Sequence, residues 1–240
     1  MRLFIAFGLV TSSVWGTTAV ILQTNSVVVI AADSKAGGVG PQGQVTYNAC
    51  KIIVEKSKGM AAVAAGLDLY RFTNFSIAND LSQAMRQATN ISEARESADK
   101  MIAKDLARAV MDIKRRFPKD FAHTKGVQYV IAGTELSGQT TVALTEFAID
   151  GAAKVSIRPA PVNRPPQNTL GQFFIGNNTA IADYVSKTPN WKYRGPLPVV
   201  AKTLVQIEVN AAPDTVGGPI AILSLNRTGR YWIEPGVCEQ

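Results

Sequence analysis

Hydrophobic residues follow a strand-like pattern over much of the chain. Short runs of β-branched and apolar residues, separated by turn-forming residues, predict strands. These segments are 17–23, 27–33, 45–56, 59–66, 126–135, 140–149, 154–160, 171–176, 218–226 and 229–235. The last two form a terminal hairpin, and the glycine-rich segment 37–44 is expected to be a loop.

Helical composition or spacing marks four further segments, 69–88, 92–116, 177–187 and 197–212. In 92–116, apolar residues recur every three or four positions, which gives the helix one buried face between a cap at Ser92 and Pro118. Strands and helix pairs therefore come in blocks, which favours antiparallel sheets with helices outside them. We expect one α+β domain with two stacked sheets covered by helix pairs.

Composition narrows the function classes. The 240 residues carry a net charge of +7, but the Lys and Arg residues are scattered and no nucleic-acid-binding motif accompanies them. Two cysteines, Cys50 and Cys238, and one histidine, His123, argue against a protein-built zinc or iron–sulfur site. We therefore expect no nucleic-acid partner, no metal and no cofactor. A Cys50–Cys238 disulfide is compatible with export, although the sequence does not place the two sulfurs together.

The N-terminal residues 1–16, "MRLFIAFGLVTSSVWG", have the shape of a short signal peptide. One arginine precedes an apolar run, and small residues precede Thr17. The alternative is a propeptide whose apolar residues only pack locally. We expect an exported protein, periplasmic or secreted, if 1–16 is a signal peptide, and a cytoplasmic one otherwise. No segment approaches the roughly 20 apolar residues of a membrane-spanning helix.

The glycine-rich segment contains Gly38, Gly40 and Gly43 in a G-x-G-x-x-G arrangement directly after a predicted strand. A dinucleotide-binding fingerprint requires a helix to begin there, so that the helix N-terminus holds the pyrophosphate. Pro41 and a β-rich segment follow here instead. We therefore reject the dinucleotide interpretation.

Thr17, Asp33 and Lys51 form the strongest candidate constellation. A hairpin of 17–23 and 27–33 returns Asp33 beside Thr17, and a strand starting near Lys51 can place an ammonium beside both. A threonine hydroxyl is a weak nucleophile that needs a base, and the α-amine of an N-terminal threonine can serve near neutral pH. A nearby ammonium favours the neutral amine, and Asp33 would orient Lys51. In most sequences, however, such threonines merely open a strand.

Several motifs resemble the catalytic β-type subunits of the proteasome over essentially all the chain after residue 16. They are "GTTAVILQTNSVVVIAADSKAGG", "NACKI", "MAAVAAGLD", "FIGNN" and "PDTVGGPIAIL". The resemblance implies a four-layer αββα sandwich of the N-terminal-nucleophile hydrolases, formed by 17–240. It further implies that Thr17 is the nucleophile, released by cleavage after Gly16, and that Asp33 and Lys51 match the family's acidic residue and lysine.

The resemblance also assigns supporting positions. Asp214 matches an acidic residue that supports the threonine, and the oxyanion hole falls on the backbone N–H of Ala64 or Gly66. Gly37 is expected to pair with a bound peptide backbone. Two departures lie in the supporting shell: Asn177 stands where the family has a serine, and Thr215 is the nearest hydroxyl to a second missing serine.

These features predict a threonine-type peptidase or amidohydrolase that acts on peptides or proteins through an acyl-enzyme. The resemblance implies a homo-oligomeric ring as its assembly. Two alternatives stay open: a non-catalytic ring subunit, and a hydrolase of small amides in the same superfamily. A non-catalytic subunit has no need of Thr17, Asp33 and Lys51 together, so the constellation favours the enzyme.

Overall fold

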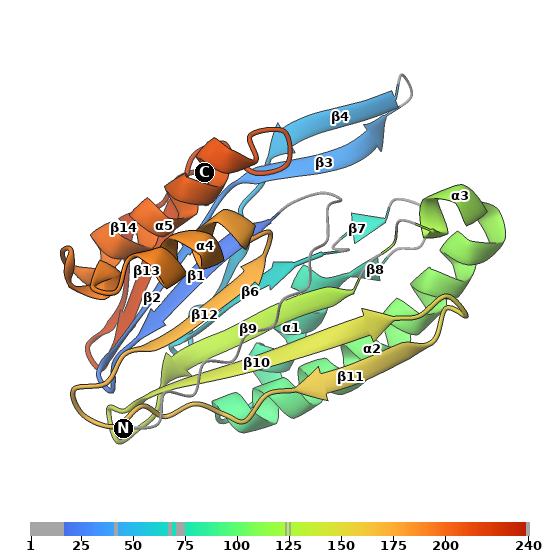
Figure 1. Ribbon diagram of the computed structural model, residues 1–240. Helices are drawn as coiled ribbons and strands as arrows, with labels where there is room; N and C mark the ends of the chain where they lie inside the picture. Colours follow the sequence, from blue (N-terminus) through green and yellow to red (C-terminus); the bar gives the residue numbers. More distant parts are fainter. Residues whose placement is uncertain are drawn as a thin grey trace.

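The computed structural model describes residues 17–40, 43–66, 69–70, 75–122, 124 and 126–238 (Figure 1). Two antiparallel five-stranded sheets form its centre. The first sheet has the order β12 (Gly171–Gly176), β1 (Thr18–Gln23), β2 (Val27–Ala32), β13 (Ala221–Asn226) and β14 (Gly229–Glu234). The second has the order β11 (Val155–Pro159), β10 (Thr140–Ile149), β9 (Val127–Thr134), β6 (Met60–Ala65) and β5 (Ile52–Glu55).

Two smaller antiparallel sheets correct the predicted architecture. β3 (Lys35–Gly40) pairs with β4 (Gly43–Asn48) in a ribbon that extends beyond the central sheets (Figure 1). β7 (Leu69–Tyr70) pairs with β8 (Phe75–Ser76). The described residues thus form four sheets, and the expected αββα sandwich of only two sheets is wrong. The loop expected at 37–44 is wrong for its described residues, 37–40 and 43–44, which lie in β3 and β4. Glycine is compatible with extended backbone as well as with turns.

The helices are α1 (Ile77–Gln87), α2 (Ile91–Arg116), α3 (Pro118–Phe121), α4 (Thr179–Lys187) and α5 (Leu197–Ala211), with a 3₁₀ turn at Trp191–Tyr193. The helix expected from residue 69 begins only at Ile77, because Phe75–Ser76 is paired as strand β8. Ser76 caps α1, and its side chain accepts a hydrogen bond from Asn79 N–H. Asn90, and not Ser92, caps α2 by accepting from Glu93 N–H.

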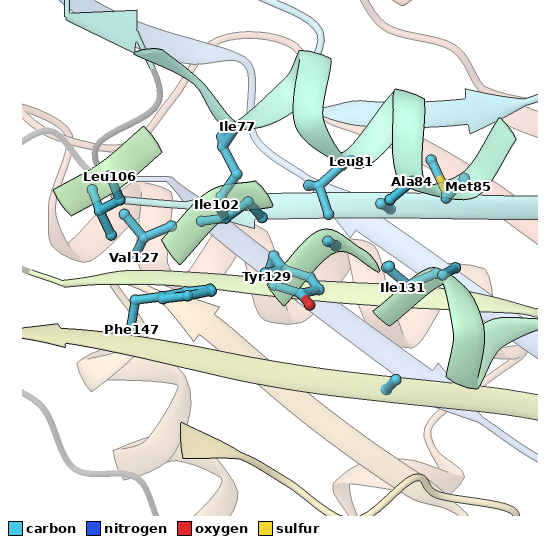
Figure 2. Packing of buried hydrophobic residues seen from close by; sticks show 14 of the residues in the cluster. Ile77, Leu81, Ala84, Met85, Ile102, Leu106, Val127, Tyr129, Ile131 and Phe147 are labelled. Carbon is cyan, nitrogen blue, oxygen red and sulfur yellow. The ribbon is translucent and has the colours of Figure 1, made fainter. Parts of the chain in front are cut away.

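Three apolar clusters hold these elements together. The first packs α1 and α2 against the second five-stranded sheet, with Leu81, Ile102 and Phe147 among its members (Figure 2). Tyr129 lies in the same cluster, and its hydroxyl donates to Asp99 at 2.6 Å. The second cluster lies where the two five-stranded sheets face each other, and the third packs α4 and α5 against the first sheet.

Some sequence-based expectations concern residues outside the described ranges. Segment 1–16, read as a signal peptide or propeptide, and His123 lie outside the described residues. Among the helices that the structure describes, none is long and apolar enough to cross a membrane.

Candidate active site

The β1–β2 hairpin brings Asp33 to the beginning of β1, as predicted. Ala19 lies opposite Ala32, so the residues just outside the ladder, Thr18 and Asp33, are neighbours. Asp33 N–H donates to the Thr18 carbonyl oxygen at 3.1 Å, and Thr18 N–H donates to Asp33 Oδ1 at 2.8 Å. Thr17, the predicted nucleophile, is therefore one residue from a buried carboxylate.

Lys51 reaches the same carboxylate from the start of β5. Its Nζ lies 2.8 Å from Asp33 Oδ1, and its side chain is only 9% exposed. Asp33 Oδ2 accepts from the backbone N–H groups of Lys35 at 3.2 Å and Gly217 at 3.1 Å. Burial raises the pKa of the Asp33 carboxyl, while the Lys51 ammonium and the N–H groups of Thr18 and Gly217 oppose the rise. Both oxygens of a carboxylate that water does not reach are thus hydrogen-bonded.

The turn after β12 holds Thr17 from the other side. Asn177 N–H donates to the Thr17 carbonyl oxygen at 2.8 Å, and the Thr18 hydroxyl donates to the Asn177 carbonyl oxygen. Asn177 Nδ2 donates to Thr215 Oγ1 at 3.3 Å, so the structure brings these two predicted supporting residues together. Gly176 has φ +79°, and a Cβ there would lie 1.8 Å from the Thr17 carbonyl oxygen. Only glycine fits this close approach.

The end of β6 lies against this turn and carries the two candidates for the oxyanion hole. A Cβ on Gly176 would lie 3.0 Å from the Ala65 Cβ. Ala65, which stands between the two candidates, is therefore next to the turn that binds Thr17. Pairing of β6 with β5 ends at Val63, whereas pairing with β9 continues to Ala65. The edge of β6 next to Lys51 is thus outside the β5 ladder from Ala64 onward. Gly66 has φ +108°, a conformation that requires glycine.

Two predicted site residues lie apart from this cluster in their described contacts. Asp214 is exposed in the turn after α5, and no hydrogen bond or ion pair of the described residues involves it. Its neighbours make the contacts instead, since Thr215 bonds Asn177 and Gly217 bonds Asp33. Gly37 lies in the β3–β4 ribbon, opposite Thr46.

Sequence reasoning missed Gln128, Gly217 and the roles of Thr18. Gln128 Oε1, on β9 of the second sheet, accepts from Gly176 N–H at 3.1 Å and so supports the turn that binds Thr17. A polar residue between buried Val127 and Tyr129 was the available signal. Gly217 lies in the quoted motif "PDTVGG", but its contact with Asp33 depends on packing between distant segments.

Thr17, the Lys51–Asp33 ion pair and the nearby backbone N–H groups are the kinds of group that amide hydrolysis by a threonine uses. No three His, Cys, Asp or Glu side chains among the described residues are arranged to hold a metal ion. Two surface hollows, of about 410 Å³ beside α1 and about 500 Å³ between α4 and α5, involve none of these residues. The hydrogen-bonded cluster, and not either hollow, is therefore the candidate site.

Comparison with known proteins defines the fold class first. No family profile and no curated protein matches the chain. Solved structures do match, at identities that bear on the fold alone, and they are proteasome-like. The chain thus has a proteasome-like fold.

The matching structures are Anbu (ancestral beta-subunit) proteins. Anbu from Yersinia bercovieri is 17% identical with a TM-score of 0.53, and the match covers 90% of this chain and 86% of that one. A Gly-1 mutant of Anbu from Hyphomicrobium sp. strain MC1 is 15% identical with a TM-score of 0.55, covering 91% and 87%. The helical assembly of the Anbu complex from Pseudomonas aeruginosa is 15% identical with a TM-score of 0.58, covering 90% and 86%.

These neighbours correct the resemblance inferred from sequence. Anbu proteins are proteasome-like but distinct from the catalytic β-type subunits that the motifs suggested. The comparisons also give no support to a signal peptide at 1–16.

Proposed function

We propose that this chain is an N-terminal threonine hydrolase that cleaves peptide amide bonds through an acyl-enzyme. The observation that carries the proposal is the buried Asp33 carboxylate, which accepts from Thr18 N–H and pairs with Lys51 at 2.8 Å each. A buried carboxylate is costly unless it is paired with an opposite charge and hydrogen-bonded. Here the compensation comes from the groups next to the proposed nucleophile.

In this mechanism, cleavage of the Gly16–Thr17 bond first frees the Thr17 α-amine. The neutral amine takes the proton of Thr17 Oγ1 as the oxygen attacks the substrate carbonyl, and the Lys51 ammonium favours the neutral form of the amine. The backbone N–H of Ala64 or of Gly66 stabilises the oxyanion. Collapse passes this proton from the Thr17 α-ammonium to the leaving nitrogen, which releases the amine of the substrate and leaves an ester on Thr17. The α-amine then takes a proton from the water that hydrolyses this ester. Asp33 keeps Lys51 charged and oriented, and Asn177 N–H positions Thr17.

Three forms of the mature chain test this function: wild type, Thr17→Ser and Thr17→Ala. Hydrolysis of fluorogenic acyl-peptides should fall below detection in Thr17→Ala, because no hydroxyl remains. Thr17→Ser should keep measurable activity, because its hydroxyl and amine occupy the same positions. Equal hydrolysis by Thr17→Ala and wild type would refute the mechanism. Cleavage of small amides but not of peptides would instead favour the small-amide hydrolase, and an inert wild type the non-catalytic subunit.

Self-association is part of the proposal. The Pseudomonas aeruginosa neighbour is a helical assembly, and the same fold here favours an oligomer of identical chains, with a ring as the form that the sequence suggested. Light scattering on the purified chain should give a mass well above the 25.7 kDa of one copy. A mass of one copy at micromolar concentration would contradict this part.

A further inference from the structure

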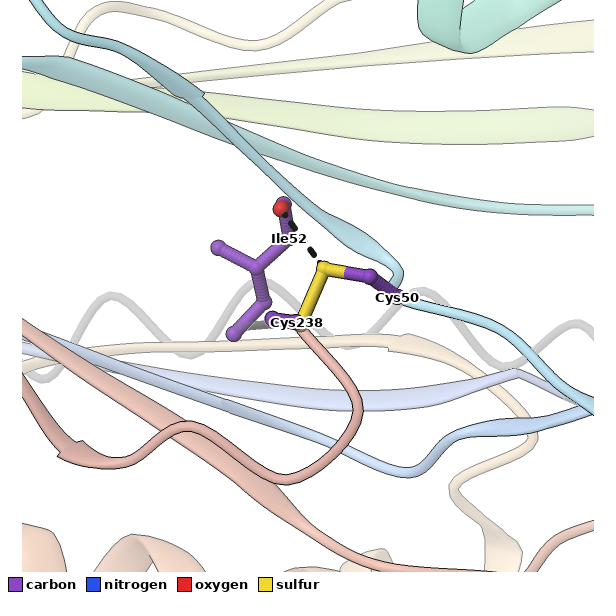
Figure 3. Close-up of a disulfide and its surroundings, with 3 residues drawn as sticks. All are labelled: Cys50, Ile52 and Cys238. Carbon is purple, nitrogen blue, oxygen red and sulfur yellow. Dashed lines mark hydrogen bonds between the residues drawn. A yellow bond between two sulfur atoms is a disulfide. The ribbon is translucent and has the colours of Figure 1, made fainter. Parts of the chain in front are cut away.

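A disulfide joins the residue before Lys51 to the C-terminal segment. Cys50 and Cys238 are 188 residues apart in sequence, and their Cα atoms are 4.7 Å apart (Figure 3). Cys50 precedes Lys51 directly, whereas Cys238 follows β14, the last strand. The bridge therefore connects the lysine of the candidate site to a part of the chain that is otherwise remote from it in sequence.

Lys51 lies in a short connection that no strand ladder fixes. β4 ends at Asn48 and β5 begins at Ile52, whose partner is Val63 on β6. Between them, Ala49 N–H donates to the Ser34 carbonyl oxygen at 2.8 Å. β5 is an edge strand of four residues with β6 as its one neighbour in the sheet. Backbone hydrogen bonds thus flank Lys51 on both sides, and Lys51 itself lies in the connection between the two strands.

The other end of the bridge is firmly seated. Cys238 packs against the apolar cluster between the two five-stranded sheets, and its N–H donates to the Pro235 carbonyl oxygen at 2.9 Å. A Cβ on Gly236 would lie 3.3 Å from the Ala221 nitrogen, so this segment runs close along the start of β13. Ala221 pairs with Ala32, the residue before Asp33. The disulfide thus ties the Lys51 connection to the strands that carry Asp33.

We propose that the Cys50–Cys238 disulfide positions Lys51, and that its reduction by a dithiol lowers hydrolytic activity while the chain stays folded. This inference rests on the proposed function. Neither cysteine touches the reacting atoms in the mechanism above, so both are positioning residues. Their contribution is the placement of an ammonium group, and misplacement of a catalytic group by about 1 Å can lower a rate by up to about 10²-fold.

Reduction proceeds by ordinary thiol–disulfide exchange. A thiolate of the dithiol attacks the Cys50 sulfur, because Cys50 is exposed and Cys238 is half-buried. The Cys238 sulfur leaves as a thiolate and takes up a proton. The second thiolate of the reagent then attacks its own sulfur in the mixed disulfide and releases Cys50, so that the reagent becomes a cyclic disulfide. The Cys50 sulfur lies 3.1 Å from the Ile52 carbonyl oxygen, an acceptor for the thiol that forms (Figure 3).

The reduced protein should lose about tenfold in kcat with little change in KM, because the connection that carries Lys51 has lost its covalent anchor at Cys50. Its pH profile should also change. When the ammonium moves away from the α-amine, the amine becomes a stronger base, and the acid limb of kcat/KM moves to higher pH. A purely structural disulfide would lower thermal stability without moving this limb.

The experiment compares the oxidised mature protein with the same protein after dithiothreitol, using a fluorogenic acyl-peptide over a range of pH. Alkylation and intact mass verify that both cysteines are reduced, and circular dichroism verifies the fold. A variant with both Cys50→Ser and Cys238→Ser is the matched control: it should behave like the reduced wild type and be insensitive to dithiothreitol. If it does not fold, the reduced wild type alone still gives the answer.

Unchanged kcat and an unchanged pH profile in fully reduced, folded protein would overturn the positioning role. A wild type with two free thiols after purification without reductant would do the same. The failure of the proposed function has a different signature. In that case the oxidised protein itself leaves Thr17 unreactive toward a threonine-directed electrophile, before any reduction is made.

Discussion

Asp33 and Asp80 lie in two regions of the molecule, and the hydrogen-bond partners of their buried carboxylate oxygens differ. At the candidate site, Asp33 is 1% exposed, and its oxygens accept from Lys51 and from backbone N–H groups of three separate residues. At the beginning of α1, Asp80 Oδ2 is buried without a hydrogen-bond partner among the described residues. Burial, and then the nearby Asp105, raise the pKa of Asp80 to about 6.

Burial alone does not explain the difference between the two carboxylates. Burial raises the pKa of both carboxyls, but only at Asp33 do distant segments converge with donors. Thr18, Lys51 and Gly217 come from the beginning of β1, the connection before β5 and the segment before β13. We infer that the fold is built to hold a charge at Asp33 and merely tolerates one at Asp80.

The largest effect is expected for Asp33→Asn. The amide leaves the Lys51 ammonium buried without its counter-charge and presents N–H groups to backbone donors. Loss of one partner of a buried pair costs about 3–5 kcal/mol, which urea unfolding would measure. Hydrolysis should fall below detection as well. Asp183→Asn is the matched control, because Asp183 pairs with Lys187 on the surface, where such a pair is worth about 0.3–0.5 kcal/mol. Equal stability of the two variants would show that the buried Asp33–Lys51 pair stabilises the fold no more than a surface pair does.

Lys51→Met should come next. Methionine keeps most of the side-chain length but removes the ammonium, so hydrolysis is expected to fall by about 10²–10⁴-fold, the usual contribution of a group that assists proton transfer. Progress curves with an acyl-peptide would measure this. Lys187→Met, which removes an exposed ammonium, should leave the rate unchanged. A Lys51→Met enzyme within twofold of wild type would mean that Asp33 holds its charge for structural reasons only.

A smaller loss is expected for Asn177→Ala. The contact of Asn177 with Thr17 is made by the backbone, and its side chain adds one neutral hydrogen bond to Thr215 at 3.3 Å. Such a bond is worth about 0.5–1.5 kcal/mol, which corresponds to roughly a two- to tenfold loss of rate. Thr215→Val should have a similar effect, and the double variant should add little. A hundredfold loss in Asn177→Ala would place its side chain in the chemistry instead.

The smallest effect, a gain, is expected for Asp80→Asn. The pKa of Asp80 is about 6 in the folded chain against 3.8 for an ordinary aspartate, so the folded state binds the proton more tightly. Its stability contribution is therefore present below about pH 4 and is lost as pH rises through about 6. After allowance for solvent screening, the free energy of unfolding of the variant should be about 1 kcal/mol higher than that of wild type at pH 7 and equal to it at pH 4. Destabilisation at pH 7 would show that the Asp80 charge has a favourable partner.

Local pattern was sufficient for part of this structure. The hairpin of β1 and β2 follows from two apolar runs around a turn, and it brings Asp33 to Thr18, the residue next to the predicted neighbour Thr17. Lys51 was found because its chemistry matched the other two residues. By contrast, a helix was expected from residue 69, but Leu69–Tyr70 and Phe75–Ser76 pair as strands β7 and β8. Glycines that suggested a loop lie in the paired strands β3 and β4. In both places, pairing with another segment overrides the local preference.

Contacts between segments that are distant along the chain could not be predicted from the sequence. Gln128 supports Gly176 across the two five-stranded sheets, and Gly217 donates to Asp33 from the other end of the chain. The pairing of Cys50 with Cys238, which are 188 residues apart in sequence, could not be decided from the sequence for the same reason. Asp214 was assigned from a motif, and the described contacts fall on its neighbours Thr215 and Gly217 instead. Whether the protein is exported or cytoplasmic stays a prediction.

The central claim is that Thr17 becomes the N-terminal residue and the nucleophile. Intact mass of the protein from its native host, before and after a threonine-directed electrophile, tests both parts at once. The account predicts a chain that begins at Thr17 and gains one adduct, with no adduct in Thr17→Ala. A chain that still carries Gly16 and gains no adduct, or an adduct that persists in Thr17→Ala, would contradict it.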